Sequence, residues 1–264
     1  MFPLSDIAID LSALSLRENS SFLQQHPVIN YRLNNREGAL NFAIVNARSL
    51  RNKLLGFDRF VRLERRDGRL LDVVIVTEAW LEIGDLKEIR GGEASYHVFT
   101  CSNNYSQGHG VAILVRKDAF ECTEKFVEEN MLAYDVKRIA DSKTVRVIGT
   151  YILNKSTIQD VKEITAAWTK LTYNVKHVIL GGDFNNDAAL LDSASGSLQV
   201  LKNFLGETWK QYVTEGTDTD PRSAKETKDW LVARKAQNDD DVLHWHVDWP
   251  NYSEHKDIVG QYYI

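Results

Sequence analysis

The chain has 264 residues, of which 43% are hydrophobic, and a formal net charge of −5 at pH 7. This composition provides for a sizeable core and excludes a disordered chain. The two cysteines exclude a disulfide scaffold and favour a reducing, intracellular compartment. Apolar runs are too short to span a membrane and no signal-peptide pattern opens the chain, so we expect no membrane partner. The negative charge argues mildly against a large nucleic-acid interface, but it suits a nuclease that touches few phosphates.

Residues 1–38 are polar and weakly periodic, which predicts a peripheral N-terminal arm ahead of a single domain at residues 39–264. Apolar positions at helical spacing predict helices at residues 50–61, 158–171 and 198–205, with Ser49 as a cap for the first. Apolar or alternating runs predict strands at residues 40–45, 71–76, 96–101, 110–116, 120–126, 133–139, 144–152, 178–180, 230–232, 242–247 and 257–264. Many strands with few helices predict two packed sheets flanked by helices.

The strand at residues 178–180 ends on the sequence Gly181-Gly182-Asp183-Phe184-Asn185. The glycines allow a sharp turn or a close approach. On an extended chain, Asp183 and Asn185 would point to one side, where an acid and an amide can hold a cation or orient a water. The alternative is an Asx-rich turn after a core strand. The motif alone does not separate these two interpretations.

Polar residues recur at the ends of the other predicted strands, at Asn46, Glu78, Tyr151 and Asp229, and Ser253-Glu254-His255 lies near the C-terminus. If the strands run in one sense at these points, the polar groups converge on one edge of a sandwich. Oxygen donors without thiolates suit Mg²⁺ or Mn²⁺ rather than structural zinc. A metal and a base together suit attack by water on a phosphate ester. Taken singly, each residue also has an ordinary explanation: a turn, a solvated carboxylate, a core tyrosine, an ion pair or a surface histidine.

Seven ordered motifs resemble those of the endonuclease/exonuclease/phosphatase superfamily, and most of all the apurinic-type endonuclease domains of non-LTR (LINE) retrotransposons. They occupy residues 46–53 (NARSLRNK), 77–81 (TEAWL), 108–115 (GHGVAILV), 147–151 (VIGTY), 181–185 (GGDFN), 228–232 (KDWLV) and 253–255 (SEH). Each motif is weak alone, but seven in this order are specific. The first two forms point to the retrotransposon branch.

The resemblance implies an α/β fold, a four-layered sandwich of two mixed or antiparallel β-sheets packed face to face and flanked by helices. It also implies a phosphodiesterase that depends on Mg²⁺ or Mn²⁺. The metal ligands would be Glu78, Asn46 and Glu254. The catalytic residues would be Asp183, Asn185, His255, Asp229, Tyr151 and Glu78. The substrate-binding residues would be Asn46, Arg48, Thr217 and Thr219.

In this scheme Asp183 activates or orients the attacking water, and Asn185 fixes Asp183 and the phosphate. His255 contacts the scissile phosphate and is held in its tautomer by Asp229, while Tyr151 lines the phosphate pocket. Charge stabilisation by the metal and the imidazole would be the dominant effect.

The chain departs from the family pattern at two places. The last motif usually reads Ser-Asp-His, and Glu254 stands here in place of the aspartate. The added methylene either retunes the metal site or weakens the enzyme, because positioning errors of about 1 Å can cost on the order of 10²-fold in rate. Residues 152–154 (ILN) follow Tyr151 where the family often has prolines, which concerns the local loop path rather than the fold.

The leading hypothesis is an endonuclease that nicks one DNA strand and leaves a 3′-hydroxyl, as in target-primed retrotransposition. DNA is then the partner, and a nuclear location follows from action on genomic DNA. The chain has no room for a reverse transcriptase, so we expect a monomeric isolated domain, a stand-alone relative or part of a larger reverse-transcriptase polyprotein. Two alternatives stay open. One is a phosphatase or exonuclease of the same fold acting on another phosphate ester, and the other is a domesticated nucleic-acid-binding domain weakened at Glu254.

Overall fold

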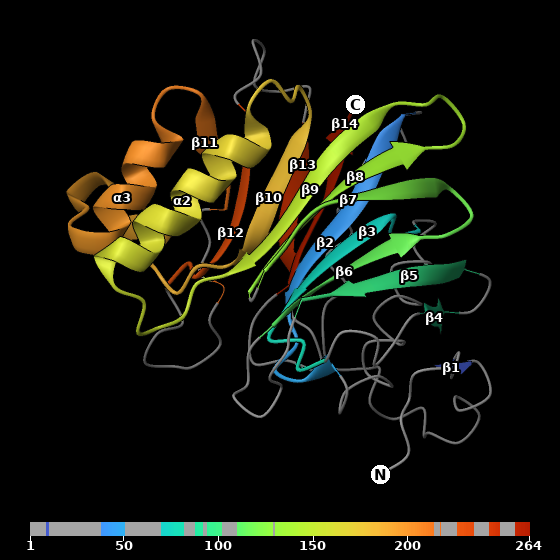
Figure 1. Cartoon of the computed structure of the whole chain (residues 1–264), viewed down its shortest axis with the longest axis horizontal. Helices are drawn as coiled ribbons and strands as arrows, with labels where there is room; N and C mark the ends of the chain where they lie inside the picture. The colour runs from blue at the N-terminus through green and yellow to red at the C-terminus, as the bar shows by residue number, and fades with distance from the viewer. Residues whose placement is uncertain are drawn as a thin grey trace.

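The structure, a computed structural model, contains two β-sheets packed face to face with helices against one of them (Figure 1). It describes residues 9–10, 38–50, 70–81, 88–91, 94–101, 110–128, 130–213, 217, 226–234, 243–248 and 257–264. The predicted α/β sandwich of two mixed sheets is confirmed. The helix predicted at residues 50–61 lies outside the described residues, apart from Leu50.

The first sheet has eight strands, and most of its neighbouring strands are antiparallel. Its spatial order is β1 (Ile9–Asp10), β4 (Glu88–Gly91), β5 (Ala94–Thr100), β6 (Val111–Arg116), β3 (Val73–Thr77), β2 (Ala39–Asn46), β14 (Asp257–Tyr263) and β13 (Leu243–Asp248). The exceptions are β1 with β4 and β2 with β3, which run parallel. Two short strands of this sheet, β1 and β4, were not predicted because two and four residues are too few for a hydrophobic pattern.

The second sheet has six strands. Its order is β11 (Trp209–Gln211), β12 (Asp229–Arg234), β10 (Val178–Asp183), β9 (Thr144–Tyr151), β8 (Met131–Arg138) and β7 (Phe120–Glu128). Only β9 and β10 run parallel among the paired strands of this sheet that the structure describes. Helix α2 (Ile158–Thr172) joins this parallel pair, as a crossover between parallel strands requires.

The core lies between the two sheets, where inward side chains such as Ile44, Ile113, Val147 and Ile179 pack together. Strands β3 and β10 are buried along their whole length. This explains why their sequences read as continuous apolar runs instead of alternating.

Helices α2 and α3 (Gly196–Leu205) cover the outer face of the second sheet (Figure 1). A capping box between Thr157 and Asp160 begins α2, and its buried positions recur at helical spacing, as do those of α3. Between them, a short 3₁₀ helix, η5, spans Ala188–Ser193. Phe184 stacks between Trp168 of α2 and Trp230 of β12, so the residue inside the Asp183-Phe184-Asn185 motif is locked into this layer.

Candidate active site

Polar residues from both sheets meet at one edge of the sandwich. In the first sheet, β2 and β3 run parallel, with Asn46 opposite Thr77, and Glu78 follows β3 directly. In the second sheet, Asp183 of β10 lies opposite Tyr151 of β9 on one side and Asp229 of β12 on the other. The expected convergence of these strand ends is therefore present in the structure.

Asn46 joins the two sheets at this edge. Its Nδ2 donates to Glu78 Oε1 at 2.9 Å and to Asp183 Oδ2 at 3.0 Å. Its Oδ1 accepts the backbone N–H of Arg48 at 3.2 Å. Because the nitrogen faces two carboxylates and the oxygen faces a donor, only one orientation of the amide satisfies the network. Asn46 and Asp183 are both buried.

Asp183 and Asn185 form a turn rather than the extended pair that the alternation predicted. Strand β10 ends at Asp183, and Asn185 has a φ of +48°. The N–H of Asn185 donates to Asp183 Oδ1 at 2.8 Å, which is an Asx turn. The Asn185 amide donates to the backbone oxygen of Ile152 at 2.7 Å. The two interpretations of the motif are therefore compatible, because the turn itself fixes the carboxylate at the shared edge.

Tyr151 contributes a phenol to the same cluster, with hydrogen-bond partners that include Asn185 and Glu78. Burial, followed by the negative charges of Glu78 and Asp183, raises the pKa of Tyr151 above its ordinary value. A tyrosine hydroxyl is protonated at neutral pH even at its ordinary pKa, so it can donate a hydrogen bond to an anionic group.

Asp229 and Thr217 support the second sheet beside Asp183. Both residues are buried. The Thr217 hydroxyl accepts the N–H groups of Lys228 at 3.1 Å and of Asp229 at 3.0 Å, so it fixes the start of β12. The predicted site residues Thr219, Glu254 and His255 lie outside the described residues. Strand β14 starts at Asp257 and runs antiparallel to β2, so its first residue lies toward the edge where Asn46 lies.

Glycines let the sheets and strands come close behind this cluster. A Cβ on Gly181 would lie 2.3 Å from Ile44 Cδ1 of the first sheet, and one on Gly149 would lie 2.8 Å from Val111 Cγ1. Gly182 has a φ of +143°, and its Cβ would lie 1.9 Å from the backbone oxygen of Thr150. The close approach predicted for the Gly-Gly pair is therefore toward the protein's own backbone and core.

Several of the described non-glycine residues at this edge adopt left-handed backbone conformations. They are Arg48 (φ +40°), Ser49 (+83°), Glu78 (+47°), Trp80 (+53°) and Asn185 (+48°). Such conformations cost on the order of 1–3 kcal/mol each and persist only where surrounding contacts impose them. The left-handed conformations of the first four could not be predicted from residue type, because none of these residues is a glycine or an asparagine.

The donors at this edge suit a hard divalent cation. Glu78 and Asp183 offer carboxylate oxygens that share one amide donor, Asn46 Nδ2, while the Asn46 oxygen accepts the N–H of Arg48. Two carboxylates so close repel each other, and a cation relieves that repulsion. Among the described residues, no group of three or more His, Cys, Asp or Glu side chains forms a site by itself. Of the metal ligands expected from the sequence, Glu78 and Asn46 are the described ones, and Glu78 is the one whose carboxylate faces this cluster.

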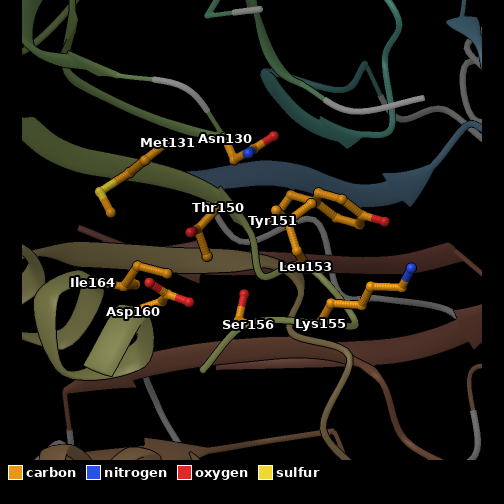
Figure 2. A pocket seen from close by; sticks show the side chains of 9 residues that line it. All are labelled: Asn130, Met131, Thr150, Tyr151, Leu153, Lys155, Ser156, Asp160 and Ile164. Atoms are coloured by element: carbon orange, nitrogen blue, oxygen red, sulfur yellow. The ribbon is translucent and has the colours of Figure 1, made fainter. Parts of the chain in front are cut away.

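A pocket of about 290 Å³ opens on the other side of Tyr151, toward α2 (Figure 2). Met131 and Ile164 form an apolar wall, and Thr150, Ser156 and Lys155 contribute polar groups. Thr150 and Tyr151 are consecutive in β9, so their side chains leave opposite faces of the strand. This pocket therefore flanks the Asn46–Asp183 cluster without containing it.

Comparisons with known proteins agree with this architecture. A sequence profile of the endonuclease/exonuclease/phosphatase family matches residues 41–250. Curated protein sequences give no match. No helix in the described part of the chain has the length and apolarity to cross a membrane.

Several solved structures share the fold at low sequence identity. The endonuclease domain of TRAS1, a telomere-specific non-LTR retrotransposon, has a TM-score of 0.63 and 16% identity, over 85% of this chain and 98% of that one. The AP endonuclease LMAP from Leishmania major has a TM-score of 0.61 and 13% identity, over 86% and 88%. The 3′ phosphatase NExo from Neisseria, bound to a product DNA hairpin, has a TM-score of 0.60 and 15% identity, over 84% and 99%. Because the family profile spans most of the chain, this protein belongs to the endonuclease/exonuclease/phosphatase family of hydrolytic phosphoesterases.

Proposed function

We propose that this protein is a divalent-metal-dependent endonuclease that nicks DNA and leaves a 3′-hydroxyl. The observation that carries the proposal is the hydrogen-bonded cluster of buried Asn46 and Asp183 with partly exposed Glu78, which forms where the two sheets meet. The similarity to the TRAS1 endonuclease domain supports DNA as the substrate. Target-primed retrotransposition, an attached reverse transcriptase and a nuclear location belong to the same proposal.

In the proposed reaction, Asp183 orients the attacking water and takes its proton. Two hydrogen bonds fix its carboxylate, from the Asn185 N–H to Oδ1 and from the Asn46 amide to Oδ2. The water oxygen forms a bond to phosphorus while the P–O3′ bond breaks, and a proton goes to O3′. A divalent cation held by Glu78 and Asn46 would neutralise the charge that develops on the phosphate.

Other residues of the cluster bind the phosphate in this proposal. The Tyr151 hydroxyl, which is protonated at neutral pH, donates to a phosphate oxygen. Arg48 supplies a cation next to the cluster, since its backbone is tied to Asn46. His255 contacts the scissile phosphate and Asp229 orients the imidazole, with Glu254 as a further metal ligand and Thr219 near the phosphate. Thr217 acts through the backbone of Asp229.

The test is nicking of supercoiled plasmid in Mg²⁺ by wild type, Asp183→Asn and Asp192→Asn. Asp183→Asn keeps the shape of the side chain but removes its basicity, and we expect its rate to fall by roughly 10³-fold or more. The control residue Asp192 is exposed in η5 and should leave the rate unchanged. DNA polymerase should extend the nick without prior phosphatase treatment if the end is a 3′-hydroxyl. Intact plasmid with wild type, or equal nicking by Asp183→Asn, would refute the proposal.

A phosphatase activity of the same site is the second candidate, favoured by the similar fold of the 3′ phosphatase NExo. The same preparations are given an oligonucleotide with a 3′-phosphate. Release of phosphate without plasmid nicking would establish this alternative. Tight DNA binding without either reaction would instead establish a binding domain.

A further inference from the structure

A chain of hydrogen bonds connects Tyr151 of the second sheet to the turn that carries Glu78 in the first. The Tyr151 N–H donates to the backbone oxygen of Asn130 at 2.9 Å. Asn130 Oδ1 in turn accepts the N–H of Gly110 at 3.1 Å. The Gly110 oxygen accepts the N–H of Ala79, the residue after Glu78, at 3.1 Å. Within this chain, Asn130 supplies the side-chain atom and lies between the two halves of the site.

Asparagine suits this position for two independent reasons. Asn130 lies just before β8 with a φ of +66°, a conformation that asparagine tolerates better than most other residues with a Cβ. Its short side chain also ends in an acceptor that reaches Gly110, which is buried. A glycine at position 130 would keep the backbone conformation but leave the Gly110 N–H without that acceptor. An unsatisfied buried N–H costs about 1–3 kcal/mol.

The Glu78 turn needs external restraint because its backbone is strained. Glu78 and Trp80 have φ values of +47° and +53°. On one side, the N–H groups of Ser49 and Leu50 donate to the oxygens of Glu78 and Ala79 at 2.8 and 3.0 Å. On the other side, the Ala79 N–H is held by Gly110, which Asn130 anchors. Releasing that side frees the turn to relax away from its present geometry.

We propose that Asn130 is a positioning residue that sets the placement of Glu78 relative to Tyr151. Figure 2 shows Asn130 and Tyr151 near each other, where β8 begins and β9 ends. Asn130 acts through Gly110 and Ala79, so it need not touch the substrate. The inference rests on the proposed function, since it concerns the geometry of that same site.

The experiment compares Asn130→Gly, Asn130→Asp and the control Asn174→Gly. Asn130→Gly keeps a left-handed backbone and removes the acceptor, whereas Asn130→Asp keeps an acceptor at the same position. Asn174 also has a positive φ, +56°, but is exposed beyond α2. The readouts are the plasmid-nicking rate constant, KM, the Mg²⁺ concentration for half-maximal rate, and the rise in Tm that Mg²⁺ produces.

We expect Asn130→Gly to lower the nicking rate constant by about 10- to 100-fold with KM little changed, because a displacement of about 1 Å has costs of this order. It should also raise the Mg²⁺ requirement and reduce the Mg²⁺-induced rise in Tm. Asn130→Asp should bring the rate constant and the Mg²⁺ response most of the way back to their wild-type values. Asn174→Gly should match wild type. If Asn130→Gly does not fold, Asn130→Ser, whose hydroxyl is too short to reach Gly110, takes its place.

The outcomes separate this inference from the proposed function. A lower Tm in Asn130→Gly with an unchanged rate constant and Mg²⁺ requirement would mean that Asn130 only stabilises the fold, which overturns the inference. Failure of Asn130→Asp to restore either quantity would also overturn it. If wild type does not nick DNA, the proposed function is refuted, but the Mg²⁺-induced rise in Tm still tests the role of Asn130 independently. Absence of that rise in wild type as well would overturn both.

Discussion

Asn46 shows how much of the site depends on one amide. Its three hydrogen bonds tie together two carboxylates and the backbone of Arg48. The two carboxylates come from different sheets and are 105 positions apart in the chain, at residues 78 and 183. The amide therefore holds two like charges in place, and a cation bound beside them would reduce their mutual repulsion.

A prediction at the residue scale concerns the hydroxyl of Thr150. Its Oγ1 is buried in the wall of the pocket beside Tyr151 and has no hydrogen-bond partner among the described residues. A valine has nearly the same shape without the polar atom. We expect Thr150→Val to raise the free energy of unfolding by about 1 kcal/mol, measured by urea denaturation.

The matched control for this change is Thr165→Val in α2. The Thr165 hydroxyl is also buried, but it donates to the backbone oxygens of Val161 and Lys162 at 3.0 Å each. Because Thr165→Val removes satisfied hydrogen bonds, its free energy of unfolding should be equal to or lower than that of wild type. A loss of stability in Thr150→Val equal to that of the control would show that the Thr150 hydroxyl has a partner.

The sequence located most of this cluster but not its local geometry. Asn46, Glu78, Tyr151 and Asp183 were identifiable because each follows or ends an apolar run. The left-handed backbone of Glu78 was not, because it is imposed by contacts from residues 49, 50 and 110. Asn130 was missed for the same reason: an asparagine before a strand gives no sign of a partner 20 residues away.

At the scale of elements, β10 can pack closely against β2 because Gly181 has no side chain to contact Ile44. We expect Gly181→Ala to cost about 1–3 kcal/mol of stability by overpacking. Ile44→Val removes the Cδ1 atom that the new methyl would meet at 2.3 Å, and alone it should cost about 1 kcal/mol. The double variant should lose less than the sum, because the first change fills space that the second vacates.

Gly196→Ala provides the control for this double-mutant cycle. A Cβ on Gly196 meets nothing within 4 Å, although, unlike Gly181, this residue has a positive φ of +56°. Its cost should therefore add to that of Ile44→Val without coupling. Strict additivity for the Gly181→Ala and Ile44→Val pair in urea denaturation would contradict the proposed contact.

Long periodic elements were predictable, and short ones were not. The helix predicted at residues 158–171 spans Ile158–Thr172, because apolar residues recur along it at helical spacing. Strand β11 has only three residues and is formed by its pairing with β12, so no local pattern identifies it. The order of strands in each sheet also could not be predicted from local sequence patterns, because it depends on which strand edges pair in space.

At the scale of the whole molecule, stability should depend on pH through Asp72. Burial outweighs the nearby Arg116 and raises the pKa of Asp72 to about 6 from its ordinary value of 3.8. The folded state therefore holds this proton more tightly than the unfolded state. The resulting stabilisation is complete below about pH 4 and is lost as the pH rises through 6, an effect on the order of 3 kcal/mol.

Asp72→Asn removes this titration while keeping an oxygen to accept the N–H of Asn41. The stability of the variant minus that of wild type should thus increase between pH 4 and pH 7. Urea denaturation at pH 4, 5, 6 and 7 measures it. Asp192→Asn is the control, because that side chain is exposed in η5. Parallel curves for Asp72→Asn and wild type would show that Asp72 keeps an ordinary pKa in the folded protein.

The left-handed residues at the site edge have a consequence for heat tolerance. Ser49 and Trp80 hold conformations that glycine adopts at little cost. Selection for resistance to heat alone would therefore favour glycine at these two positions early. Each such glycine substitution would also make the backbone segment that carries Arg48 or Glu78 more flexible. Laboratory evolution of this protein must select for catalytic turnover together with thermal stability, because both depend on the backbone conformation of these same segments.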